Sequence, residues 1–385
     1  MLETSGKSTE EPFSDENYYN FDYNGTGWWN ITAPDLDSYD PKIYKEWHIA
    51  VMLGRYVPPG LLIIGTLLNA LTMVVLSHKR MRMAVPVVYM QFLLFSCTLA
   101  LHVAVLPGWM RHLDFGEFTT LNVFSCKFYV YMSYFSTDIP AWVLVSCALH
   151  QVAGIVLPEW TTKSVSRCKA TIGVSSIAFM LFLINMPMAV ISKLFTWKSV
   201  DGTIKLCASE VHGAMKVFIK HFWPWMDFAL FAALPSFILV FTTTIFVIHL
   251  ISVRRQRNTT GFIPIYNSTR MLPTIIGLSV SFVLMTCPIC VNILFIRFGP
   301  KFSSTYQLAQ NYLWYTLGTI SQYLFYSSCF FSFLLSPNFR FELRRILCPW
   351  SPCVLKEAKI FPIEVDNSIE KINKVFIDEA AGTEV

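Results

Sequence analysis

Seven long apolar runs constrain how this chain can fold more than any other feature of its sequence. A helix of about 20 apolar residues is long enough to cross the hydrocarbon core of a bilayer. With 54% hydrophobic and 14% charged residues, the chain is too apolar for an ordinary soluble domain. We therefore predict an all-α membrane protein, a bundle of seven transmembrane helices. The runs cover roughly residues 52–77, 85–108, 124–156, 168–193, 222–251, 271–297 and 306–335.

The third run is the longest and carries one carboxylate near its middle. From Cys126 to Pro158, a helix of this length measures about 50 Å. An unpaired charge at mid-depth in a bilayer is costly, so Asp138 should face the interior of a bundle or a wet cavity. We therefore expect other helices to surround this span.

Basic residues follow the first and third runs and lie between the fifth and sixth. The positive-inside rule places such loops in the cytoplasm, which puts the N-terminus outside. The first 50 residues are acidic and lack the apolar core of a cleaved signal peptide, so we expect the first span to act as the targeting signal. The basic residues of these loops are Lys79, Arg80, Arg82, Lys163, Arg167, Lys169, Arg254, Arg255, Arg257 and Arg270.

This orientation selects among the N-x-S/T sequons of the chain. Asn24 and Asn30 lie in the outer tail, and Asn258 and Asn267 lie in a cytoplasmic loop where glycosylation does not occur. We predict a multi-pass protein of the plasma membrane that is glycosylated at Asn24 and Asn30.

Cysteine placement gives an independent check on the orientation. Of ten cysteines, Cys126 and Cys207 are the two that fall on the outer side of the predicted spans. Disulfides persist in oxidising compartments, so this pair is the predicted bridge between the third span and the loop before the fifth. The alternative is two unpaired thiols.

Several short patterns occur in a fixed order along the spans. Gly65 and Asn69 form G-x-x-x-N in the first span, Cys126 begins the third, and Trp142 stands in S-x-x-x-x-x-W-V-L-V. With the seven spans and the outer N-terminus, this order resembles a rhodopsin-like, or class A, G-protein-coupled receptor from about residue 50 to 348. Within that class, YFSTDIPAWVLVSCALHQVAGIVLP and SPNFRFELRRIL are most similar to invertebrate peptide receptors of the FMRFamide-receptor type. The resemblance implies a receptor for an extracellular neuropeptide that signals through a heterotrimeric G protein, arrestin or both.

Two positions that the family uses for ions and signalling differ here. Cys97 stands where the family has a sodium-binding Asp, and a thiol is a poor ligand for a hard cation, so we expect neither this nor any other metal site. His150 and Gln151 occupy the first two places of the family's Asp-Arg-Tyr triplet. Gln151 has neither the charge nor the forked geometry of the Arg that contacts the G protein in the family.

The sixth and seventh spans also depart from the family's switch motifs. Phe282 and Pro288 are kept, but Thr286 replaces the switch tryptophan of Cys-Trp-x-Pro. The segment from Ser328 to Ser332 replaces Asn-Pro-x-x-Tyr. The alternative to a productive receptor is therefore a seven-helix receptor that binds ligand and does not couple, or acts only through arrestin.

The resemblance places ligand recognition in the outer half of the bundle, on the third, fifth, sixth and seventh spans. Ser133 takes the position of the ammonium-binding Asp of amine receptors, which argues against a monoamine, whereas Asp227 is suited to a cationic group of a peptide. For Asp138, the favoured interpretation is an internal hydrogen-bond acceptor against the fourth span. The candidate ligand-binding residues are Ser133, Tyr134, Asp138, Trp225, Asp227, Asn292, Arg297, Gln310, Asn311 and Trp314.

The chain after the seventh span has three features. Residues 337–348 have the spacing of an amphipathic helix on the inner leaflet, with arginines near anionic lipid. Cys348 and Cys353 are candidates for palmitoylation, with reduced thiols as the alternative. Thr383-Glu384-Val385 fits a PDZ ligand. We thus divide the chain into an outer tail (1–50), a bundle (51–336), a surface helix (337–348) and a cytoplasmic tail (349–385).

Other classes of function lack support in the sequence. HExxH, Walker A, GxGxxG and GxSxG patterns do not occur, so we expect no enzyme activity, no cofactor and no nucleic-acid partner. A transporter or channel is the main rival. It is expected to show internal repeats and broken helices in corresponding halves, which the sequence does not show.

Overall fold

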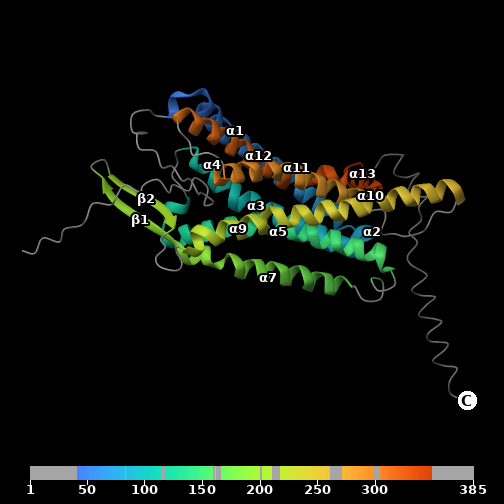
Figure 1. Ribbon diagram of the computed structural model, residues 1–385. Helices are drawn as coiled ribbons and strands as arrows, with labels where there is room; N and C mark the ends of the chain where they lie inside the picture. The colour runs from blue at the N-terminus through green and yellow to red at the C-terminus, as the bar shows by residue number, and fades with distance from the viewer. Residues whose placement is uncertain are drawn as a thin grey trace, which may run out of the picture.

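The structure is a computed structural model, and it is mostly helical (Figure 1). It describes residues 41–82, 84–113, 118–158, 161, 166–199, 202–209, 217–260, 271–298 and 304–348. The predicted glycosylation sites, Cys353 and the C-terminal PDZ-like segment lie outside the described residues.

Long helices run side by side along the length of the molecule (Figure 1). Asn122, Ser166 and Ser304 each cap the N-terminus of one of them, because the side-chain oxygen accepts a hydrogen bond from a backbone N–H in the first turn. The main helices are α1 (Lys45–Leu76), α3 (Val85–Ala100), α4 (Leu106–Arg111), α5 (Val123–Val156), α7 (Arg167–Ile191), α9 (Trp223–Phe228), α10 (Leu234–Thr260), α11 (Leu272–Phe298) and α12 (Thr305–Phe333).

Six helical segments among the described residues are long and apolar enough to cross a membrane, so the chain is a multi-pass membrane protein. The seventh long helix, α12, packs against α1 and α11, but its polar side chains keep it out of this set. The seven-helix bundle therefore stays a prediction. The six are Lys45–Leu76, Val85–Met110, Val123–Val156, Arg167–Ile191, Trp223–Gln256 and Leu272–Ile296.

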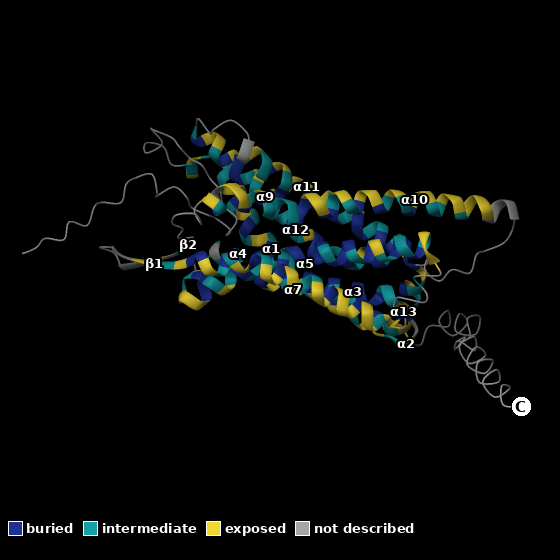
Figure 2. Cartoon of the chain, turned by 60° about the horizontal axis from the view of Figure 1, so that its bottom comes forward, coloured by how far each residue is buried: buried dark blue, intermediate teal, exposed yellow. Residues whose placement is uncertain are grey.

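The third predicted span is at the centre of the bundle, as expected. In the most apolar stretches of α3 and α5, 61% and 56% of the residues are buried, against 28–33% in the other four segments. Figure 2 shows exposed residues along α7 and α10 and buried ones along α3 and α5. Exposed side chains such as Ile64, Phe179 and Phe237 are apolar, which is typical of helices that face lipid.

Prolines locally widen two of the helices. A π-helical turn at Leu101–Val105 comes just before Pro107, and two further turns, at Phe218–Phe222 and Ala229–Ala233, come before Pro224 and Pro235. A proline has no N–H and its ring clashes with the carbonyl four residues earlier, and a wider turn relieves that clash.

A β-hairpin joins α7 to the segment before α9, and it corrects the all-α prediction. Strands β1 (Ser192–Ser199) and β2 (Gly202–Ser209) pair antiparallel, with Leu194 opposite Cys207. Cys207 forms a disulfide with Cys126 at the start of α5, which confirms the predicted bridge. We call this end of the bundle the hairpin end.

The opposite end carries two short helices, α2 (Lys79–Arg82) and α13 (Pro337–Leu347), and we call it the α13 end (Figure 1). Phe339 is fully buried and contacts Phe330 and Phe333, whereas Arg340 and Arg344 are exposed, so the predicted amphipathic helix is confirmed. A feature that was not expected is Glu342, which is fully buried 3.1 Å from the His78 imidazole.

Candidate functional site

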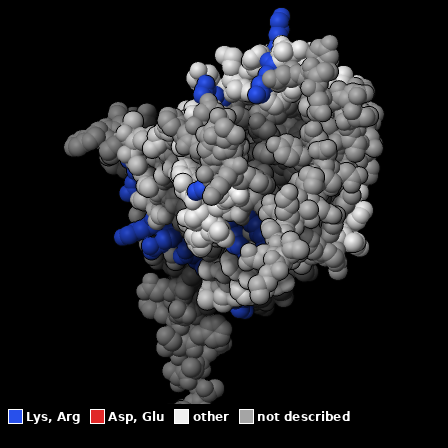
Figure 3. Space-filling model, turned by 90° about the vertical axis from the view of Figure 1, so that its left-hand side faces the viewer, with Lys and Arg blue, Asp and Glu red and all other residues white. Residues whose placement is uncertain are grey.

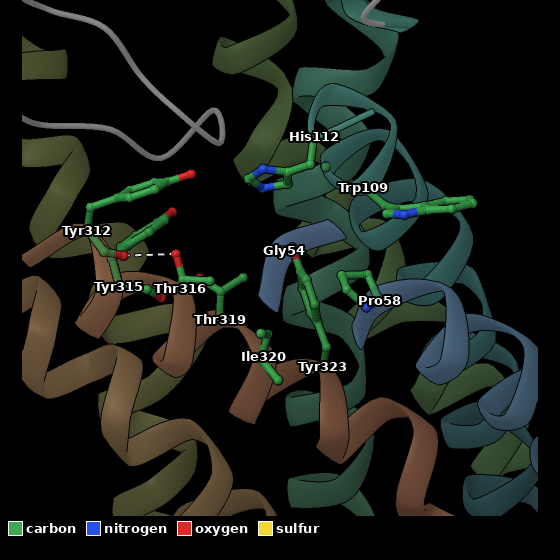
Figure 4. A pocket seen from close by; sticks show the side chains of 11 residues that line it. Gly54, Pro58, Trp109, His112, Tyr312, Tyr315, Thr316, Thr319, Ile320 and Tyr323 are labelled. Atoms are coloured by element: carbon green, nitrogen blue, oxygen red, sulfur yellow. Dashed lines mark hydrogen bonds between the residues drawn. The ribbon is translucent and has the colours of Figure 1, made fainter. Parts of the chain in front are cut away.

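A pocket opens between α1, α4 and α12 in the half of the bundle nearer the hairpin end (Figures 1 and 4). About 430 Å³ of space, which includes open solvent, lies between its lining residues. This pocket was not predicted from the sequence, because its residues come from three distant segments. It is lined by Gly54, Pro58, Gly108, Trp109, His112, Tyr312, Tyr315, Thr316, Thr319, Ile320 and Tyr323.

Aromatic rings and hydroxyl groups surround this pocket. Figure 4 shows Tyr312 and Tyr315 on one side, with His112 pointing toward them and Tyr323 extending from α12 toward Gly54. Trp109 turns away, and its indole N–H donates a hydrogen bond of 2.8 Å to the Arg55 carbonyl oxygen. The one signal in the sequence was the recurrence of tyrosine and threonine at helical spacing in the last run.

Glycines on α1 set how closely its neighbours approach. A Cβ on Gly54 would lie 2.7 Å from Nε2 of His112, so the imidazole occupies the space that a side chain would need. A Cβ on Gly65 would lie 2.6 Å from the Cβ of Ser327, so α1 and α12 are in close contact there. A small residue at position 65 thus allows these two helices to pack closely.

A second polar cluster lies between α5, α7 and α9. Asn185 donates a hydrogen bond of 2.9 Å to the Asp138 carboxylate, and both side chains are buried. Asp138 also interacts electrostatically with Asp227. The predicted hydrogen bond of Asp138 to the fourth span is thus confirmed.

An apolar layer covers this cluster on the side toward the hairpin. Tyr134 and Trp223 lie four residues before Asp138 and Asp227 on their helices, and their rings are in edge contact at 5.8 Å. Since residues four apart share a helical face, the two carboxylates lie one turn below two packed rings. Met188 belongs to the same buried cluster of side chains.

The remaining candidate ligand residues fall into two groups. Asn292 donates a hydrogen bond of 3.4 Å to Asn311 in the interior between α11 and α12, and Ser133 is half-buried. Trp225, Gln310 and Trp314 are exposed on the outside of their helices, so the structure does not bring these three together with the interior residues. The Arg297 side chain lies outside the described part of the chain.

The positions that replace the switch motifs are mostly buried. The Cys97 and Cys329 sulfurs are 3.7 Å apart, and both thiols are buried. At the α13 end of α5, the centroid of the His150 ring lies 5.5 Å from that of Tyr89, and Gln151 is 1% exposed.

On α11 and α12, Phe282 is in edge contact with Phe325 at 5.2 Å, so the retained phenylalanine links these two helices. Ser328 donates to the sulfur of Met285, and Ser332 is buried. Thr286 is buried whereas Pro288 is exposed.

Among the modification sites, Cys348 is exposed at the end of α13, which suits an acyl chain that would enter the membrane. Cys168 is exposed as well, at the same end of the bundle. Palmitoylation of Cys348 stays a prediction.

No protein-family model matches the chain, and no curated protein matches it either. The functional interpretation therefore depends on the geometry of the site and on the sequence patterns.

Proposed function

We propose that this protein is a cell-surface receptor with seven membrane-spanning helices, activated by an extracellular peptide. The Cys126–Cys207 disulfide carries the proposal, because it ties the hairpin to the start of the central helix at the end where the pocket opens. A pocket at the end of the bundle where a disulfide restrains the hairpin suits a site that captures ligands from solution. The resemblance to class A receptors supports the same function.

Two separate regions of the bundle are suited to different parts of a peptide. The carboxylates of Asp138 and Asp227 interact electrostatically, so a positively charged ligand group near them would be favoured, and Asp227 is the less buried of the two. The pocket between α1, α4 and α12 offers rings and hydroxyl groups. A ligand that contacts both regions must extend across the bundle, as a peptide does.

Signalling partners would bind at the α13 end. Lys79 and Arg82 are exposed there and Arg254 lies on the exposed end of α10, as the positive-inside rule requires of a cytoplasmic face (Figure 1). Arg340 and Arg344 would contact anionic lipid headgroups. The partners are a heterotrimeric G protein, arrestin or both, with a PDZ scaffold at the C-terminus.

Burial of Gln151 favours a second form of the proposal, in which coupling to the G protein is weak. The family uses an arginine here as a contact, and a buried, uncharged amide offers a partner protein neither charge nor access. In this form the receptor binds its peptide and acts through arrestin or as a partner subunit.

The test is a peptide library applied to cells that express the protein, with guanine-nucleotide exchange and arrestin recruitment both measured. We expect at least one peptide to act through one of the two readouts. Asp227→Asn and Arg297→Gln should each lower the potency of that peptide, whereas Ser176→Ala on the exposed face of α7 should leave its potency unchanged. Peptide-independent ion current or solute uptake, with no response in either readout, would favour the transporter or channel alternative.

The orientation of the chain in the membrane can be tested separately. Removing the sequons with Asn24→Gln and Asn30→Gln should abolish the mobility shift produced by glycosidase, and removing Asn258 and Asn267 should leave it unchanged. Glycans on Asn258 or Asn267 would place the hairpin end in the cytoplasm and contradict the receptor proposal.

A further inference from the structure

One stripe of α12 forms a wall of the pocket between α1, α4 and α12. Tyr312, Tyr315, Thr319 and Tyr323 follow one another at intervals of three or four residues, so they share one helical face. The ring of Trp47 stacks on Tyr312 with centroids 4.4 Å apart, which supports that ring. The wall is therefore aromatic and firmly held.

The threonines of the wall add little polarity. Thr316 and Thr319 donate hydrogen bonds of 2.8 and 2.9 Å to the carbonyl oxygens of Tyr312 and Tyr315. Their hydroxyl protons are therefore used within the helix. The other polar side chains that line the pocket are those of the tyrosines, Trp109 and His112.

The opposite wall depends on the absence of a side chain at Gly54. The His112 ring packs where a Cβ on Gly54 would stand, and it points into the pocket (Figure 4). Any residue larger than glycine at position 54 must displace the imidazole. Gly54 thus determines where one of the rings stands.

The charge around the pocket decides which ligand it suits. A cage of rings can hold a cation or a neutral aromatic group. Among the described residues, no Asp, Glu, Lys or Arg lines the pocket, and burial of a charge without a countercharge is costly. On the face at the hairpin end, the described residues that Figure 3 colours by charge are Lys and Arg.

We propose that this pocket binds a neutral aromatic side chain of the ligand. Its ring would stack against, or lie edge-on to, the rings of Tyr315, Tyr323 and His112, in the offset arrangements that aromatic groups prefer. This inference rests on the proposed receptor function and names the part of the peptide that enters this region.

The experiment compares two glycine substitutions on α1. Gly54→Ala pushes His112 out of place, whereas Gly60→Ala adds a methyl group that meets nothing within 4 Å. Binding of N-acetylphenylalaninamide and N-acetylargininamide to the purified full-length protein in nanodiscs is measured by saturation-transfer NMR. We expect the aromatic probe to bind the wild type and Gly60→Ala, and to bind Gly54→Ala about tenfold more weakly.

A second pair of variants covers the case in which Gly54→Ala does not fold. Tyr323→Ala removes a ring from the pocket, and Tyr56→Ala removes one that is 68% exposed on α1. Only the first should weaken binding of the aromatic probe. The proposal would be overturned if the aromatic probe bound equally to both variants of each pair that folds. It would also be overturned if the wild type bound the arginine probe more strongly than the aromatic one.

This failure is distinguishable from failure of the receptor proposal, because probe binding is measured without signalling. If a peptide activates the wild type in cells and no aromatic probe binds the pocket, the aromatic inference alone is wrong. If the probe binds with the expected dependence on Gly54 and no peptide acts in either cellular readout, the receptor proposal alone is contradicted.

Discussion

The indole N–H of Trp142 donates a hydrogen bond of 2.9 Å to the carbonyl oxygen of Leu230 on the neighbouring helix. Leu230 lies in the π-helical turn before Pro235, where the bonding pattern runs from each carbonyl to the N–H five residues later. For Leu230 that residue is Pro235, which has no N–H. Trp142 thus supplies the donor that the proline removes, and it ties α5 to the kinked helix.

Replacing Trp142 by phenylalanine should therefore destabilise the protein although the aromatic ring is kept. The Leu230 carbonyl loses its donor, which costs about 1–3 kcal/mol when the group is shielded from water. The measurement is thermal unfolding of the purified protein in nanodiscs. Trp314→Phe, at a site that is 65% exposed, is the matched control and should unfold near the wild-type temperature.

A second prediction concerns the hydrogen bond between Asn185 and Asp138. Asn185→Ala leaves a buried carboxylate oxygen without this donor and should cost about 1–3 kcal/mol of stability. Replacing both residues by leucine should recover much of that loss, because no polar atom of the pair then stays buried without a partner. A double variant that is less stable than Asn185→Ala would show that the carboxylate has a further favourable partner.

Loss of the disulfide should destabilise the hairpin end. Cys126 and Cys207 are 81 residues apart, and closing a loop of that length contributes up to about 4 kcal/mol. Cys126→Ser, Cys207→Ser and the double variant should reduce surface expression equally, since each removes the same bond. Cys168→Ser, which removes an exposed free thiol, should have no effect. Mass mapping that finds both thiols free in the folded wild type would contradict the bridge.

The sequence predicted the long helices well, because continuous apolar runs have few alternatives to a membrane span. It placed Asp138 against the fourth span and paired Cys126 with Cys207, and both predictions are confirmed. In each case an isolated feature, a lone carboxylate or two outer thiols, left little choice of partner.

The pocket and the hairpin were missed for different reasons. The pocket depends on an absent Cβ at Gly54 and on side chains from three distant segments, which no local sequence pattern reveals. The hairpin does have a turn signal, Asp201-Gly202 between two stretches with apolar residues, which the prediction of an all-α bundle overlooks. The exposure of Trp314 depends on the rotation of α12, which packing against α1 and α11 fixes. Aromatic residues near one end of a span are therefore weak guides to a ligand site.

The last prediction concerns signalling and the residues at the α13 end of α5. His150 packs its ring against Tyr89 and Gln151 is buried, so this end of the helix is stabilised by neutral contacts where the resembled family has a charged lock. Restoring that lock with His150→Asp and Gln151→Arg removes the ring contact and introduces two charges. We expect the double variant to be less stable than the wild type and to show greater peptide-stimulated nucleotide exchange, because the arginine offers a partner the charge that Gln151 lacks. His150→Phe, which keeps a ring beside Tyr89, is the control for the lost contact and should leave exchange unchanged. Strong wild-type exchange that the restored pair does not alter would show that this pair of residues does not limit coupling.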